Sequence, residues 1–152
     1  MASLKERLQS DLHDAMKARD DVRRRTIRMA LTAVTNEEVA GDAARELSDE
    51  EVLDILATQA KRRRESAEVF VRGGRDDLAQ KEREELAVLE TYLPAQLGDD
   101  ELRGIVDAAL AETGASSPKQ MGLVVKTVLG KVGKQADGKR VAALVRERLT
   151  AG

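Results

Sequence analysis

Apolar residues recur at every third or fourth position along most of the chain, and this spacing constrains the fold most strongly. In the first segment Leu4, Leu8 and Leu12 share one side of a helix with 3.6 residues per turn. Only two prolines among 152 residues interrupt such patterns. No segment shows the strict alternation of a half-buried strand. The sequence therefore predicts an all-α protein.

Helix start and stop signals divide this pattern into seven expected helices. Ser3 and Ser48 are each followed three residues later by Glu, which is the capping-box pattern. Ser117 before Pro118 marks another start, and Asp137 is expected to cap the last helix. The expected helices cover residues 3–19, 21–38, 48–72, 77–93, 99–113, 121–132 and 138–149.

The segment from Pro94 to Gly98 is the expected domain boundary, because a helix breaker and a glycine bracket it. The charge also changes sign along the chain. Residues 117–152 hold eight Lys or Arg against two Asp or Glu, whereas residues 1–116 hold 18 against 26. We expect an N-terminal domain of about four helices at residues 1–96 and a small three-helix C-terminal domain at residues 97–152.

The composition excludes several kinds of chemistry. The chain has no cysteine, so disulfides, Cys-ligated zinc, iron–sulfur clusters and thiol nucleophiles are ruled out. His13 is the only histidine, and aromatic residues make up 1% of the chain, which argues against multi-histidine sites and base-stacking platforms. A phosphate-loop match at Lys126-Thr127 fails because Val125 replaces the required glycine. We predict no catalytic residue, no metal ligand and no cofactor.

No apolar run approaches the ~20 residues of a membrane helix. The first residues alternate charge with leucine and lack the apolar centre of a signal peptide. These features lead us to expect a soluble, cytoplasmic protein without membrane contact.

Two cationic runs lie in the N-terminal half. Arg23, Arg24, Arg25 and Arg28 either meet phosphates or form a self-neutralised face, through Asp20–Arg24 and Asp21–Arg25 pairs at i,i+4 spacing. The run at residues 61–64 turns through about 300° of helix, so it cannot form one patch.

The C-terminal cations are the candidate binding residues, because few acids in the same segment offset them. They surround a glycine-marked junction between two expected helices. Either they contact phosphates of an RNA, with glycines letting the backbone approach, or they form a solvated face. The candidate nucleic-acid contacts are Lys126, Lys131, Lys134, Lys139 and Arg140.

Several separate motifs resemble the YqeY-like family over essentially the whole chain. They read SDEEV at residues 48–52, RESAEVF at 64–70, GRDDLA at 74–79 and YLP at 92–94. The tail, with MG at 121–122, GK at 130–131 and ADG at 136–138, is similar to the C-terminal domain of GatB, a subunit of the tRNA-dependent amidotransferase. That second resemblance covers about residues 97–150. One departure is Leu123-Val124-Val125, where the usual Lys-Val-Met would supply a lysine.

The resemblance implies an all-helical, two-part architecture whose small C-terminal domain contacts the body of tRNA in GatB. The resemblance does not extend to the catalytic domain of GatB. Carbon–nitrogen ligase activity with glutamine as amide donor therefore follows from homology alone. The leading hypothesis is an accessory protein that binds tRNA or another structured RNA. The alternative is a protein–protein adaptor that docks on an aminoacylation or amidotransferase complex.

Overall fold

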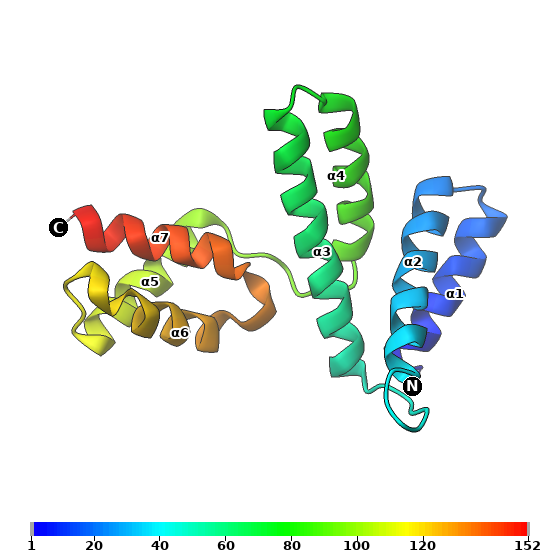
Figure 1. Ribbon diagram of the computed structural model, residues 1–152, viewed down its shortest axis with the longest axis horizontal. Coiled ribbons are helices and arrows are strands. Elements are labelled where there is room, and N and C mark those ends of the chain that lie inside the picture. The colour runs from blue at the N-terminus through cyan, green and yellow to red at the C-terminus, as the bar shows by residue number, and fades with distance from the viewer. Residues whose placement is uncertain (1, 152) are drawn as a thin grey trace. The chain divides into compact units, whose positions relative to one another are not determined.

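The computed structural model describes residues 2–151, and every regular element within them is a helix. The all-α prediction is confirmed (Figure 1). The chain divides into two compact units, Met1–Leu93 and Pro94–Gly152. That division lies three residues before the boundary expected between residues 96 and 97. Independent folding of the two parts stays a prediction.

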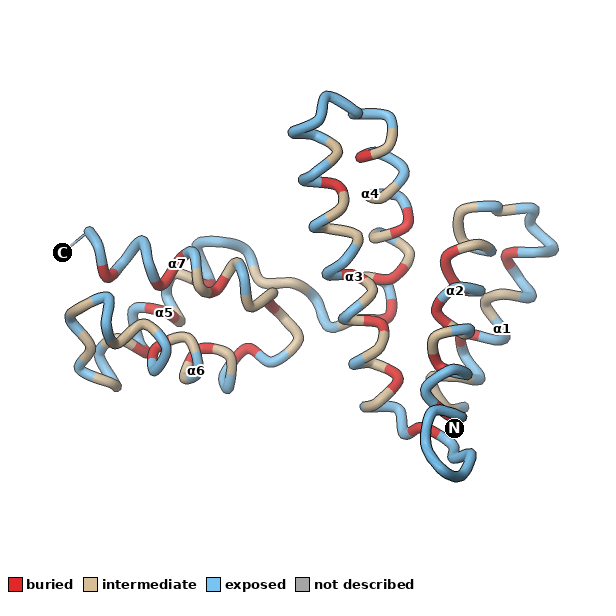
Figure 2. The backbone as a smooth tube through the Cα atoms, viewed as in Figure 1, coloured by how far each residue is buried: buried red, intermediate tan, exposed pale blue. Residues whose placement is uncertain are grey.

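The first unit contains four helices: α1 (Leu4–Lys17), α2 (Asp21–Glu38), α3 (Asp49–Arg72) and α4 (Asp76–Glu90). Helices α3 and α4 lie side by side, α1 packs on α2, and α2 contacts both α3 and α4. The apolar stripes meet in one core, visible as the buried positions on the facing sides of the helices (Figure 2). The largest fully buried side chains of this core are Leu8, Ile27, Val34, Val52, Leu56 and Leu89.

The second unit contains α5 (Asp99–Thr113), α6 (Met121–Val132) and α7 (Gly138–Ala151), with short 3-10 turns at Pro118–Gln120 and Gly133–Gln135. Its core is rich in valine, and Val124, Val128 and Val145 are fully buried. The valine-rich segment after Met121 is helical, as its apolar spacing predicted despite its β-branched residues. Over residues 2–151, no helix has both the length and the apolar character that crossing a membrane requires.

Local capping explains where the helices begin. The Oγ atom of Ser3 accepts the N–H of Glu6, and a complete capping box joins Ser48 and Glu51. Arg45 donates two hydrogen bonds to the Glu51 carboxylate, and together with the N–H of Ser48 it lowers the pKa of Glu51 to about 2. Helix α4 ends at Glu90, before the Pro94 stop that the sequence indicated.

The expected i,i+4 pairs at the start of α2 are wrong. The carboxylate of Asp20 caps α2 by accepting the N–H of Arg23 at 3.1 Å, and Asp21 pairs with Arg24 at i,i+3. Arg25 turns instead to Glu85 on α4, with 3.0 Å between Nε and Oε1. A buried carboxylate held by tertiary packing competes better for the guanidinium than an exposed neighbour on the same helix.

Glu85 is the centre of a charged network that joins three helices. Its side chain is 5% exposed and accepts from Arg25 of α2. Its second oxygen lies 3.3 Å from Nε of Arg63 on α3, and Arg63 also reaches Glu82 of α4 at 3.2 Å. One residue of the cationic run at 61–64 is therefore turned into the unit, in agreement with the prediction that the run forms no single patch.

Candidate nucleic-acid interface

The junction between α6 and α7 has a defined backbone. Helix α6 ends at Val132, and Gly133 follows with φ +54°, a region that favours glycine. Oδ1 of Asp137 accepts the N–H of Lys139 at 2.8 Å, so the predicted cap of α7 is confirmed. We call the segment from Lys131 to Lys139 the junction.

The segment before α5 fastens this junction to the rest of the unit. The N–H of Leu97 donates to the carbonyl of Gln135 at 2.9 Å, and Nε2 of Gln96 donates to the carbonyl of Lys134 at 2.9 Å. Because these two hydrogen bonds hold backbone carbonyls of the junction, its side chains project from a backbone of defined conformation.

Three of the five candidate residues lie at the junction. Lys131 is in the last turn of α6, Lys134 is in the 3-10 turn, and Lys139 is in the first turn of α7. Lys131 and Lys139 are exposed, and Lys134 is partly buried. Nζ of Lys131 lies 2.7 Å from Oε2 of Glu112 on α5. The fold thus brings these three residues to one end of the unit.

Lys126 lies on another side of α6. Five residues separate it from Lys131, which places the two about 140° apart around the helix axis. Lys126 is exposed, and its neighbour Leu123, at i−3, is 52% exposed. Leu123 therefore places an apolar side chain on an open surface beside Lys126.

Arg140 has a structural role that the sequence did not reveal. Its guanidinium donates to Oδ1 of Asp99 from Nε at 2.8 Å and to the carbonyl of Leu97 at 2.5 Å. These bonds hold α7 to the start of α5. The only sequence signal for them was Asp99 itself, which marked a helix start.

Carboxylates of α5 offset several of the C-terminal cations. Glu112 pairs with Lys131, Asp99 with Arg140 at 2.7 Å, and Asp107 with Arg148 at 3.0 Å. The second unit contains nine Lys or Arg against seven Asp or Glu, a net charge of +2. The charge contrast expected from residues 117–152 is therefore reduced on folding, because α5 packs against α7 and α6.

The junction offers the ammonium groups of three lysines, which suit phosphate oxygens, and it also contains the Asp137 carboxylate that caps α7. Across residues 2–151, no group of three or more His, Asp or Glu side chains is placed to hold a metal ion. Arg103 of α5 pairs with Glu147 of α7, which raises the pKa of the Arg103 guanidinium.

Comparison with known proteins identifies the relatives of the chain. A family model described as Yqey-like protein matches residues 5–149. The curated protein "Altered inheritance of mitochondria protein 41, mitochondrial" of Eremothecium gossypii is 38% identical over 108 residues, which cover 69% of this chain and 58% of that protein. Its counterpart from Kluyveromyces lactis is 34% identical over 128 residues, covering 82% and 66%.

The chain spans about three-fifths of the length of these curated relatives. The names of those yeast proteins describe them as mitochondrial.

Proposed function

The chain belongs to the YqeY-like family, and on that premise we propose that it is an accessory RNA-binding protein. Its ligand is tRNA or another structured RNA, contacted through phosphates at the junction between α6 and α7. The observation that carries the proposal is the placement of Lys131, Lys134 and Lys139 at one fastened turn. Lysines on a fixed backbone bind phosphates at defined positions and do not distinguish one base from another.

The five candidate residues take different parts in this proposal. The three junction lysines make the main phosphate contacts, and Lys126 makes a separate contact from another side of α6. Arg140 supports the surface by holding α7 to α5. The similarity of the tail to the C-terminal domain of GatB supports tRNA as the ligand.

The proposal includes no bond-making step. We expect the purified chain to transfer no amide from glutamine to a mischarged tRNA, and such transfer by the chain alone would contradict the accessory role. We propose that the protein acts in the cytoplasm. The location of a fluorescent fusion in the source cells tests this proposal against the mitochondrial location that the names of the yeast relatives give.

Filter binding of the full chain to tRNA at several salt concentrations tests the proposal. Affinity should fall as salt rises, because each neutralised phosphate releases condensed counterions. Replacing Lys131, Lys134 and Lys139 together by Ala should weaken binding and flatten the log–log salt slope by about 0.7 to 0.9 for each lost contact. Lys131 must give up or share its contact with Glu112, 2.7 Å away, when it binds a phosphate.

A matched variant removes the same charge elsewhere. Arg72, Lys81 and Arg83 are exposed on the first unit, and their joint replacement by Ala should leave the salt slope unchanged. Equal tRNA affinity of the wild type and the junction variant would reject the interface, as would affinity that does not depend on salt. The protein–protein adaptor would then become the leading hypothesis.

A further inference from the structure

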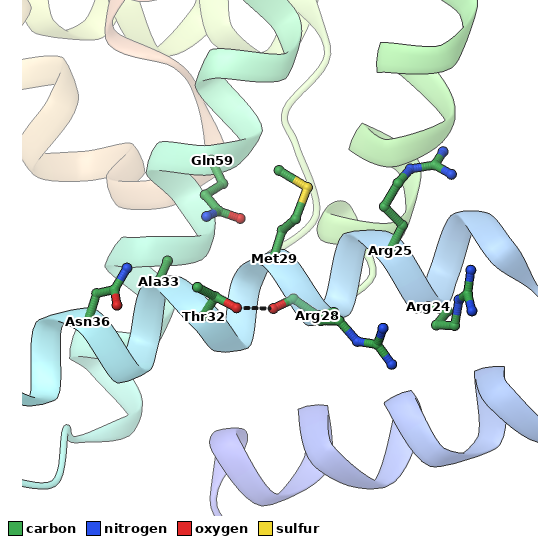
Figure 3. Close-up of a pocket in the computed structure, with 8 residues that line it drawn as sticks. All are labelled: Arg24, Arg25, Arg28, Met29, Thr32, Ala33, Asn36 and Gln59. Atoms are coloured by element: carbon green, nitrogen blue, oxygen red, sulfur yellow. Dashed lines mark hydrogen bonds between the residues drawn. The ribbon is translucent and has the colours of Figure 1, made fainter.

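A groove of about 530 Å³ on the first unit contains three arginines that the proposed function does not use (Figure 3). Two rows of α2 side chains, each with a spacing of four residues, form most of its surface. The first row is Arg24, Arg28, Thr32 and Asn36, and the second is Arg25, Met29 and Ala33. Gln59 of α3 supplies the opposite wall.

The cationic end of the groove has one guanidinium without a carboxylate. Arg28 is exposed, lies 3.9 Å from the sulfur of Met16, and pairs with no Asp or Glu in residues 2–151. Arg24 pairs only with Asp21, whose side chain is 74% exposed. Arg25 is already bound to the buried Glu85. Arg24 and Arg28, one turn apart, are thus open to an anion with several oxygens, such as a phosphate group.

The middle of the groove is apolar and its far side carries amides. Met29 is 43% exposed and lies beside Ala33, so together they offer an apolar floor. Asn36 and Gln59 provide both hydrogen-bond donors and acceptors beside that floor. Eight residues separate Arg28 from Asn36, which is ~12 Å along the helix axis. This order suits a ligand with a phosphate at one end and a flat polar ring at the other.

Acidic residues beyond the amides fix the direction of such a ligand. The adjoining hollow shares Ala33 and Gln59 with the groove, and its charged lining residues are Glu37, Asp54 and Arg62. Two carboxylates against one guanidinium make that hollow less favourable for a phosphate than the end of the groove that holds Arg24 and Arg28. The phosphate therefore belongs at the arginine end.

We propose that this groove binds a nucleotide. Its phosphate lies between Arg24 and Arg28, and its base covers Met29 and Ala33 with an edge toward Gln59. The same chemistry is presented by a free nucleoside monophosphate and by one nucleotide of an unpaired RNA strand. The site lies wholly in the first unit and stands independently of the RNA interface proposed for the second.

Calorimetric titration of the full chain tests the groove with four nucleoside monophosphates, inorganic phosphate and an unstructured five-nucleotide RNA. At least one nucleotide or the short RNA should bind more tightly than inorganic phosphate. Arg28→Ala should weaken that binding by about tenfold or more, because a charge-assisted hydrogen bond is lost. Arg83→Ala, which removes an exposed arginine of α4, is the control and should bind like the wild type.

Gln59→Ala separates the contact to the base from the contact to the phosphate. It should weaken nucleotide binding and leave the weaker binding of inorganic phosphate unchanged. Binding of the short RNA alone, reduced by Arg28→Ala, supports the groove with an RNA strand as the source. Binding of free nucleotides, reduced in the same way, supports it with a small-molecule source.

Three results overturn the nucleotide site: no binding of any nucleotide or short RNA, equal affinity for nucleotides and inorganic phosphate, or unchanged affinity in Arg28→Ala. The triple-Ala variant of the junction should keep its nucleotide affinity, so failure of the groove and failure of the RNA interface give different results.

Discussion

The hydroxyl of Tyr92 donates a hydrogen bond to Oδ2 of Asp11 at 2.5 Å and thereby joins the segment after α4 to α1. The Arg7 guanidinium lies 4.7 Å from the centre of the Tyr92 ring and 3.9 Å from the same carboxylate. Burial and, next, the hydrogen bond to Asp11 raise the pKa of Tyr92 above its ordinary value of 10.0. One aromatic side chain therefore connects both ends of the first unit.

Removing that hydroxyl should destabilise the protein in a pH-dependent way. Tyr92→Phe should cost about 1.5 to 3 kcal/mol at neutral pH, because a hydrogen bond to a charged acceptor is lost. Because the pKa of Tyr92 is higher in the folded state than in the unfolded state, its protonated hydroxyl adds to the free energy of unfolding below pH 10. This contribution is lost as the pH rises through the folded-state pKa. The stability curves of wild type and Tyr92→Phe should therefore converge in strong alkali, as urea unfolding at several pH values will measure.

The same tyrosine offers a direct check, because it is the only one in the chain. Alkaline titration followed by tyrosinate absorbance should give a midpoint well above 10 in the folded protein. A midpoint near 10 would contradict the bond to Asp11.

Loss of the buried carboxylate of Glu85 should be among the most damaging changes to the first unit. Glu85→Ala leaves Arg25 and Arg63 without their shared partner, and the buried Nε of Arg63 loses the carboxylate that lies 3.3 Å away. We expect a loss of about 3 kcal/mol in the free energy of unfolding. Glu84→Ala, at the exposed neighbouring position, should change it by less than about 0.5 kcal/mol. Equal melting of the two variants would show that the network contributes no stability.

Arg140→Ala should destabilise the second unit by about 2 kcal/mol, because the bonds to Asp99 and the Leu97 carbonyl are lost. Arg146→Ala removes an exposed arginine of the same helix and should have little effect on melting. A double-mutant cycle with Asp99→Ala isolates the energy of the pair. No coupling in that cycle would show that the pair adds no stability and that the Arg140 guanidinium is available to a phosphate.

Limited proteolysis should cut first between Pro94 and Gly98. This segment lies between α4 and α5, and Pro94, Ala95 and Gly98 are exposed. The fragment of residues 94–152 tests whether the second unit folds alone, with helical circular dichroism and cooperative melting as the expected result. First cuts elsewhere, together with an unfolded fragment, would show one inseparable core.

The helix pattern and the caps were readable from the sequence because both are local. Ser48 and Glu51 recognise each other across three residues, and Asp137 bonds to an N–H two residues away. The apolar residues that repeat at helical spacing became the buried cores of the two units. The fold class and the candidate lysines at the junction follow from such short-range information.

Charge pairing was decided only by the tertiary structure. Arg25 was expected to meet Asp21 on its own helix and instead meets Glu85, 60 residues away. Arg140, whose expected phosphate contact stays a prediction, also holds Asp99, 41 residues away. Long guanidinium side chains reach several carboxylates, and burial, which strengthens a charge pair by excluding water, selects among them. In the arginine groove, Arg25 contacts Glu85 of α4 in place of Asp21, and Asp21 pairs with Arg24.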